Sequence, residues 1–452
     1  MERDIPVNNR LRLLRTTSVL LGTALTAVSL AACGGGTNDA SKPDIVSEEE
    51  IQKALDKPTE LTVWSWSASL PDVAKAFEKE HPKIKIKVQN VGTGAEQYTK
   101  LQNAIKAGSG GPDLATVEYS AIPQFALSGS LVDLHRFEFG SLEKEFTKAT
   151  WDAVNVNDGL YELPLNAGPM ALFYNKKTFD KHDIAVPKTW DEYIDAGRKL
   201  HAADPNSYIA ADNGNAGLTE SLIWAAGGKP FSANGDKVSI NLQDAGTKKF
   251  ATTYQKLIDE KLLSPVAGWS NEWYAGLAKG NIATLLSGAW MGGTLKSGVP
   301  DGAGDWRVAP LPTYDGKPAS SVNGGGSLAM LKQSEKQLAA AAFLRYVSAG
   351  KGADITQATG SFPARTKVLE SEKFLAEKDP YFGGQEVNRI FTSSLGAVHE
   401  GWQYLPYDVY AISIFNDKVG KAFTGSLTLQ EGLNAWQKAL VAYGTDQGFA
   451  MN

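Results

Sequence analysis

The sequence of 452 residues has a single cysteine, Cys33, so no disulfide can form within the chain and burial of apolar side chains must stabilise the fold. It lacks the G-x-S-x-G and H-E-x-x-H motifs and the Walker A pattern, and its five histidines are scattered without zinc-site spacing. Lysine plus arginine (45) nearly balance aspartate plus glutamate (50), which argues against a nucleic-acid partner. We therefore predict no catalytic residue, no metal and no cofactor.

The N-terminus has the pattern of a secretion signal. A basic start precedes an apolar stretch, 18–30, that is too short to cross a bilayer comfortably. The run L-A-A-C that ends at Cys33 resembles a bacterial lipobox, in which the cysteine is lipidated and becomes the mature N-terminus. We predict a signal peptide at 1–33 and a lipid anchor on the extracytoplasmic face of the cell membrane, at a Gram-positive surface. An ordinary secreted protein and a periplasmic location are the alternatives.

Downstream, the chain alternates between strand and helix patterns. We predict a flexible, polar linker at 34–59, because its first part is rich in glycine and has little apolar content. A strand that begins near Leu61 and runs into Trp64-Ser65-Trp66 is followed by a helix that ends near Pro82. Three further elements are predicted at 84–88 (strand), 97–106 (helix) and 114–118 (strand). This alternation is typical of an α/β protein with a parallel sheet.

Helix starts are predicted further along the chain by three capping boxes. Each pairs a serine or threonine with a glutamate or glutamine three residues later: Thr189 with Glu192, Ser334 with Gln337, and Thr428 with Glu431. In the last of these helices Leu433, Trp436 and Leu440 form an apolar stripe, so we predict that Trp436 and the helical Trp190 belong to the core.

Four separated segments carry a resemblance to a known family. They are VWSWSASLPDVAKAFEKEHPKIKIKV, LPLNAGPMALFYNKKTFDKHDIAVPKTWDEY, GLAKGNIATLLSGAW with WRVAPLP, and NGGGSLAMLKQSEKQLAAAAFLRYV with SFPAR. In this order they resemble the family 1 extracellular solute-binding proteins, the sugar-binding components of ABC importers. The resemblance implies a monomer that binds a solute between two lobes and delivers it to permease subunits with a separate ATPase.

The fold that the resemblance implies is a two-lobe, periplasmic-binding-protein-like (type II) α/β fold. Each lobe would hold a parallel-type sheet flanked by helices, and crossover strands would act as a hinge. We assign residues 60–167 and 318–372 to the first lobe and residues 168–317 and 373–452 to the second. Closure around a solute shifts a two-state equilibrium only if the solute contacts both lobes better in the closed form.

The solute class is predicted from the 11 tryptophans and 15 tyrosines. Aromatic faces cover the apolar faces of sugar rings and leave the hydroxyls to polar side chains. We therefore predict a disaccharide or short oligosaccharide, with Trp290 as the strongest candidate contact. The candidate ligand-binding residues follow strand ends, lie at the first hinge crossing or come from loops: Trp64, Trp66, Glu118, Tyr119, Asn166, Asp212, Asn213, Trp269, Trp273, Trp290, Gly324, Gly325, Trp402 and Tyr404.

Two alternatives remain open at this stage. A secreted glycoside hydrolase would also be exported and rich in aromatic residues, but it needs two carboxylates at a fixed separation, which sequence spacing cannot show. A binder of glycerol phosphate, polyamine or iron on the same fold would need cationic clamps, carboxylate cages or tyrosine and histidine clusters. The tryptophan-rich stretches favour a sugar over these solutes.

Overall fold

The computed structural model describes residues 45–452, so the predicted signal peptide and Cys33 lie outside the described residues. The predicted linker is corrected at its end, because helix α1 (Glu48–Leu55) lies within it. Ser47 and Glu50 form a capping box at the start of α1, and Ile51 and Leu55 are buried in an apolar core. Glutamates in the first turn also complement the helix dipole. The folded body therefore begins before residue 59.

The first lobe is defined by an apolar core drawn from residues 46–163 and 328–364. Strands β1 and β2 pair in parallel, as do β1 and β3, and the elements predicted between 61 and 118 are confirmed. After α1, the elements of this lobe are β1 (Thr59–Trp64), α2 (Leu70–Glu80), β2 (Ile84–Gln89), α3 (Ala95–Ala107), β3 (Leu114–Glu118), η1 (Tyr119–Ala121), α4 (Ile122–Leu127), η2 (Leu134–Phe137), η3 (Phe139–Glu145), α5 (Lys148–Val154), β4 (Asn155–Val156), β5 (Gly159–Leu160), α12 (Gln337–Ala349) and α13 (Lys351–Ala358).

The second lobe is defined by two further apolar clusters, drawn from residues 167–322 and 362–451. Its elements are α6 (Lys176–Lys181), α7 (Trp190–Ala203), β7 (Ala210–Ala211), α8 (Ala216–Ala225), β8 (Phe231–Asn234), β9 (Lys237–Ile240), α9 (Ala245–Asp259), β10 (Leu263–Ser264), α10 (Asn271–Lys279), β11 (Thr284–Gly288), α11 (Met291–Gly298), η4 (Pro300–Gly302), β12 (Trp306–Ala309), α14 (Thr366–Leu369), α15 (Glu372–Leu375), α16 (Val387–Gly396), α17 (Asp408–Lys418), α18 (Gly420–Phe423), α19 (Leu429–Asp446) and β14 (Ala450–Met451).

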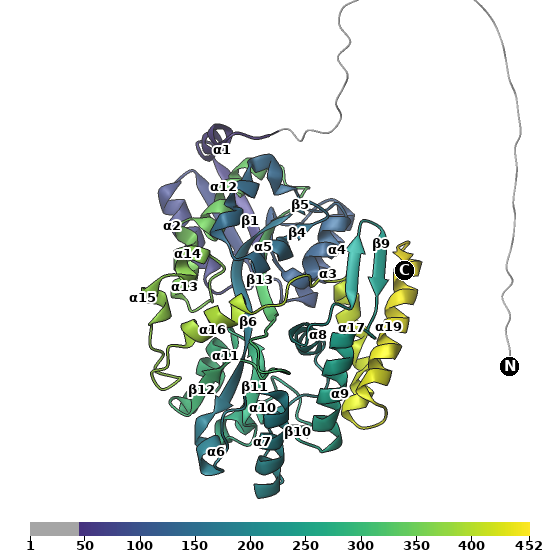
Figure 1. Ribbon diagram of the computed structural model, residues 1–452. Coiled ribbons are helices and arrows are strands. Elements are labelled where there is room, and N and C mark those ends of the chain that lie inside the picture. Colours follow the sequence, from purple (N-terminus) through teal and green to yellow (C-terminus); the bar gives the residue numbers. More distant parts are fainter. Residues whose placement is uncertain (1–44) are drawn as a thin grey trace, which may run out of the picture. The chain divides into compact units, whose positions relative to one another are not determined.

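Two long strands, β6 (Glu162–Asn175) and β13 (Val322–Met330), join the lobes. The main sheet has the order β11-β6-β13-β3-β1-β2, with β12 also paired to β6. Figure 1 shows β6 running from beside α5 to β11 and β12. In the second lobe β11 and β12 are antiparallel to β6, where the sequence predicted a parallel-type sheet. One continuous sheet therefore carries the chain from lobe to lobe.

The packing of the lobe boundaries differs in detail from the assignment made from sequence. Val322 and Leu369 pack in a second-lobe cluster, although the predicted range 318–372 assigned them to the first lobe. The crossing on β13 therefore lies between Val322 and Leu328, within its glycine run. Sequence could not place this point, because the lobe against which each half of the strand packs depends on distant segments.

Two of the three predicted capping boxes are confirmed, those of Thr189 and Thr428. The third is wrong, because α12 has Lys336 as its N-cap, with no side-chain cap bond. The Ser334 hydroxyl instead donates to Asp113 at 2.6 Å. Its oxygen accepts from the Lys336 amide at 3.1 Å, two residues on, and not from the Gln337 amide that the predicted box requires. Trp190 and Trp436 are buried, as predicted.

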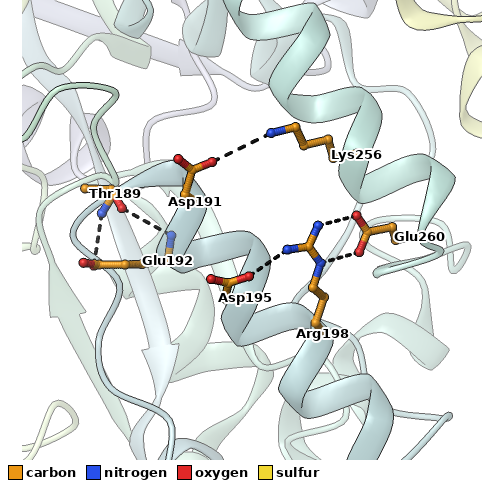
Figure 2. A network of polar contacts seen from close by, with 7 residues as sticks. All are labelled: Thr189, Asp191, Glu192, Asp195, Arg198, Lys256 and Glu260. Atoms are coloured by element: carbon orange, nitrogen blue, oxygen red, sulfur yellow. Dashed lines mark hydrogen bonds and ion pairs between the residues drawn. The ribbon is translucent and has the colours of Figure 1, made fainter.

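Ion pairs on the surface connect helices α7 and α9, as Figure 2 shows. Arg198 donates to both carboxylate oxygens of Glu260, at 2.5 and 2.6 Å, and to Asp195 at 2.7 Å. Lys256 and Asp191 lie 3.8 Å apart. Such solvent-exposed pairs contribute little to stability, so the cores hold the lobe together. Within residues 45–452, no helix is long and apolar enough to cross a membrane.

Candidate functional site

A cleft of about 1120 Å³ lies between the two lobes, and its walls come from both. The first lobe supplies residues that follow β1 and β3, and the second supplies the loops around α8, α10 and α11. Every candidate ligand-binding residue except Trp64 lines this cleft; these are Trp66, Glu118, Tyr119, Asn166, Asp212, Asn213, Trp269, Trp273, Trp290, Gly324, Gly325, Trp402 and Tyr404. Their contact with a solute stays a prediction.

Trp64 is not at the cleft, so that prediction is corrected. It is the last residue of β1, belongs to the first-lobe core, and donates its indole N–H to Gln89 at 3.1 Å. The strand ends at this residue, so strand alternation does not fix the direction of Trp66. Trp66 lines the cleft and packs edge-on against Tyr98 with ring centroids 6.2 Å apart.

The second-lobe wall carries two stacked indoles. The rings of Trp269 and Trp290 lie 5.8 Å apart at 24°, and the buried Trp273 supports Trp269 at 5.3 Å. Trp269 is 53% exposed. Trp290 is 37% exposed, as predicted from its position just after the carboxyl end of β11. The Trp290 indole donates to the Asn323 carbonyl oxygen at 2.8 Å, which fixes its ring. Two partly exposed indoles therefore line this side of the cleft.

The opposite wall, in the first lobe, is polar. Tyr98 donates its hydroxyl to Glu118 Oε2 at 2.9 Å, and burial raises the pKa of Glu118 above its ordinary value although this hydrogen bond lowers it. Tyr119 donates to the Asn166 carbonyl oxygen at 2.8 Å. Asn166 accepts from the Gly326 amide at 2.9 Å and so ties β6 to β13 where they cross. The first-lobe side of the cleft thus holds carboxylate and amide groups.

Two glycines bring the backbone of β13 close to the aromatic side chains. Gly324 and Gly325 have φ values of 70° and 93°, which side-chain-bearing residues rarely adopt. A Cβ on Gly324 would lie 3.0 Å from Trp290 Nε1, and one on Gly325 would lie 2.8 Å from the Tyr119 ring. The glycines therefore permit tight packing of both walls, in addition to any approach to a solute.

Asp212 shapes a loop of the second-lobe wall. Its Oδ1 accepts from the amides of Gly214 at 2.9 Å and Asn215 at 3.2 Å, and its Oδ2 accepts from the Tyr254 hydroxyl at 2.8 Å. These bonds lower the pKa of Asp212, but burial outweighs them and raises it. Because both carboxylate oxygens are occupied, Asp212 positions the loop, and its neighbour Asn213 is the exposed member.

The remaining wall contains Trp224, which sequence reasoning missed, beside the predicted Trp402 and Tyr404. Trp224 stacks on Trp402 with centroids 5.2 Å apart at 8°, and Tyr404 meets both edge-on. A second cavity of about 570 Å³ lies against the same three aromatic residues. Trp224 lies in an apolar helix, so hydrophobic periodicity did not mark it as a cleft residue. Asn323 also lines the cleft, and because it precedes Gly324 and Gly325 the sequence could have identified it together with them.

The described lining of the cleft has acidic and neutral polar side chains but no cationic one. Its lining residues include carboxylates, amides and indoles but no lysine, arginine or histidine. Among residues 45–452 no group of three or more histidine, cysteine, aspartate or glutamate residues could hold a metal ion. An anionic solute would find no charge-assisted donor in the cleft as described.

Comparisons with known proteins agree with this geometry. The family model of bacterial extracellular solute-binding proteins matches residues 64–354. The chain is 27% identical to the lactose-binding protein of Rhizobium radiobacter over 360 residues, 74% of this chain and 82% of that protein.

Two solved structures are also similar. One is the ABC transporter associated binding protein from B. animalis subsp. lactis Bl-04 in complex with β-1,6-galactobiose, at 45% identity and a TM-score of 0.79, covering 87% of this chain and 99% of that one. The other is the galacto-N-biose-/lacto-N-biose I-binding protein from Bifidobacterium longum in complex with lacto-N-biose, at 26% identity and a TM-score of 0.76, covering 87% and 98% respectively.

Proposed function

Because this chain belongs to the bacterial extracellular solute-binding proteins, we propose that its cleft captures a disaccharide or short oligosaccharide for an ABC importer. The observation that carries this proposal is that one cleft is lined by two exposed, stacked indoles, Trp269 and Trp290, and by carboxylate and amide side chains. A sugar ring has apolar faces that suit an indole and hydroxyls that suit carboxylates and amides. The absence of cations from the described lining disfavours phosphate esters.

The protein would bind and deliver its solute without changing it. The hinge strands β6 and β13 connect the lobes, so a sugar that contacts both walls shifts the lobes toward closure. The protein would act as a monomer, and permease subunits with a separate ATPase would bind its closed form. The predicted lipid on Cys33 would keep the protein at the extracytoplasmic face of the membrane, which at a Gram-positive surface prevents its loss.

The direct test is isothermal titration of residues 45–452 against a panel of disaccharides and oligosaccharides. The relative with 45% identity was solved with β-1,6-galactobiose, so this sugar is tested first, followed by lactose and longer galactosides. Glycerol phosphate and polyamines serve as controls. One-to-one binding of one sugar family supports the proposal, and binding of a control solute alone would overturn it.

Hydrolysis is tested in the same samples. Chromatography of the sugar after prolonged incubation should show it unchanged, and release of monosaccharide would instead indicate a hydrolase. For the anchor, full-length protein and Cys33→Ala are expressed in a Gram-positive host and fractionated. The wild type should sediment with membranes and the variant should be released into the medium.

A further inference from the structure

Two carboxyl groups, those of Glu220 and Asp408, are buried where the lobes meet. Glu220 lies on α8 at the floor of the cleft and is 3% exposed, and Asp408 is the first residue of α17 and is 0% exposed. Asp408 faces both Glu220 and Ser120. Ser120 belongs to η1 of the first lobe, and α17 contacts both α8 and η1. The pair is therefore covered on one side by the other lobe.

No cation neutralises this pair among residues 45–452. Within the described residues, the groups that shift the pKa of Glu220 and Asp408 besides burial are each other and the Ser120 hydroxyl. Tyr404 lies near both carboxyls, and its pKa is raised by burial and then by the charges of Glu220, Asp408 and, from the first lobe, Glu118. The neighbouring elements α9, α18, α19 and β13 contribute no titratable group that acts on either carboxyl in this part of the chain.

The carboxyl oxygens are also poorly satisfied. Glu220 Oε1 and both Oδ atoms of Asp408 are buried without a partner in regular hydrogen-bond geometry. An ionised carboxylate is costly in such a place, and two ionised carboxylates side by side are costlier still. The pair must therefore hold a proton while it is covered.

We propose that Glu220 and Asp408 form a proton-binding site that couples closure of the cleft to pH. While η1 covers the pair, water is excluded and the proton is retained. When η1 withdraws from α17, water reaches both carboxyls and the proton leaves. The covered form therefore binds more protons than the open form. The proton site itself does not depend on the identity of the solute, whereas its effect on affinity rests on the proposed function.

The direction of the pH effect follows from the pKa shifts. Burial raises the pKa of Glu220 well above its ordinary value, and the neighbouring Asp408 raises it further. Burial also raises the pKa of Asp408, to about 8, although hydrogen bonds with Glu220 and Ser120 lower it. A raised pKa stabilises the covered form at low pH, and this advantage is lost as pH rises toward about 8. Sugar affinity should fall over this window by up to about tenfold per pH unit for each proton taken up.

Infrared spectroscopy tests the proton site without any sugar. At pH 7 the wild type should show the carbonyl band of a protonated, buried carboxyl group. Glu220→Gln and Asp408→Asn should each weaken it and the double variant should remove it, whereas Asp417→Asn, a matched change on the exposed face of α17, should keep it. A spectrum with only ionised carboxylates at pH 7, or a band of unchanged intensity in the double variant, would overturn the assignment.

Coupling to closure is tested by small-angle scattering and calorimetry. The radius of gyration of the sugar-free wild type should increase between pH 5.5 and 8.5, and that of the double variant Glu220→Gln with Asp408→Asn should be constant. Titration with β-1,6-galactobiose in buffers of different ionisation enthalpy should show proton uptake near pH 7 in the wild type and in Asp417→Asn but not in the double variant. Equal pH responses in the wild type and the double variant would refute the coupling. Failure of the sugar to bind would count against the proposed ligand, while infrared and scattering still decide the proton site.

Discussion

Replacing Trp269 by alanine tests the aromatic wall most directly. An indole side chain has on the order of 200 Å² of surface, and Trp269 is 53% exposed, so roughly 100 Å² is open. A sugar ring that covers about half of this area gains about 1.3 kcal/mol at ~25 cal/mol per Å². The dissociation constant of the sugar should therefore rise about tenfold in Trp269→Ala. By the same arithmetic Trp290→Ala, which removes an indole that is 37% exposed, should raise the dissociation constant about fivefold.

The assay is isothermal titration with the best sugar of the panel, alongside thermal unfolding. Trp269→Tyr keeps a ring and should retain most of the affinity. Tyr410→Ala removes a ring from the Tyr410–Tyr443 stack, which does not line the cleft, and should leave the affinity unchanged. A dissociation constant within twofold of wild type in folded Trp269→Ala would refute the role of this wall.

Three further predictions concern the framework. Gly324→Ala should lower the free energy of unfolding by about 1–2 kcal/mol and weaken sugar binding, measured by urea unfolding and titration, because its φ is 70° and the new Cβ meets Trp290; unchanged stability would contradict the strain. Trp436→Ala should cost about 3–5 kcal/mol in urea unfolding, since Trp436 is fully buried; a smaller loss would mean that the core refills. Arg198→Ala should hardly change the melting temperature at any salt concentration, because its carboxylate partners are exposed.

Local signals in the sequence were reliable where the interactions were local. The capping boxes at Thr189 and Thr428 formed because both partners lie within one turn. Ser334 carries the same pattern, yet its hydroxyl bonds Asp113, which comes from a distant segment. The helix at Glu48 was missed because the glycine-rich composition before it suggested a longer linker.

The candidate site was predicted well at the level of residue type and less well at the level of direction. Trp290 was placed by its position after a strand, and it lines the cleft as predicted. Trp64 is also a tryptophan and lies two residues from Trp66, but its ring packs in the first-lobe core. Asp212 reaches the cleft, yet its oxygens are used by its own loop and by Tyr254. Which acceptors remain free depends on contacts between distant segments.

The sequence by itself determined the alternation of strands and helices in the first lobe, the supply of aromatic residues and the family, because periodicity, composition and motif order are written along the chain. Only the tertiary structure decided which indoles face the cleft, where β13 crosses between lobes, and that Glu220 and Asp408 share one buried place under η1. These features depend on segments that lie far apart in the chain. Burial and proximity arise when such segments pack together, and no local pattern records them.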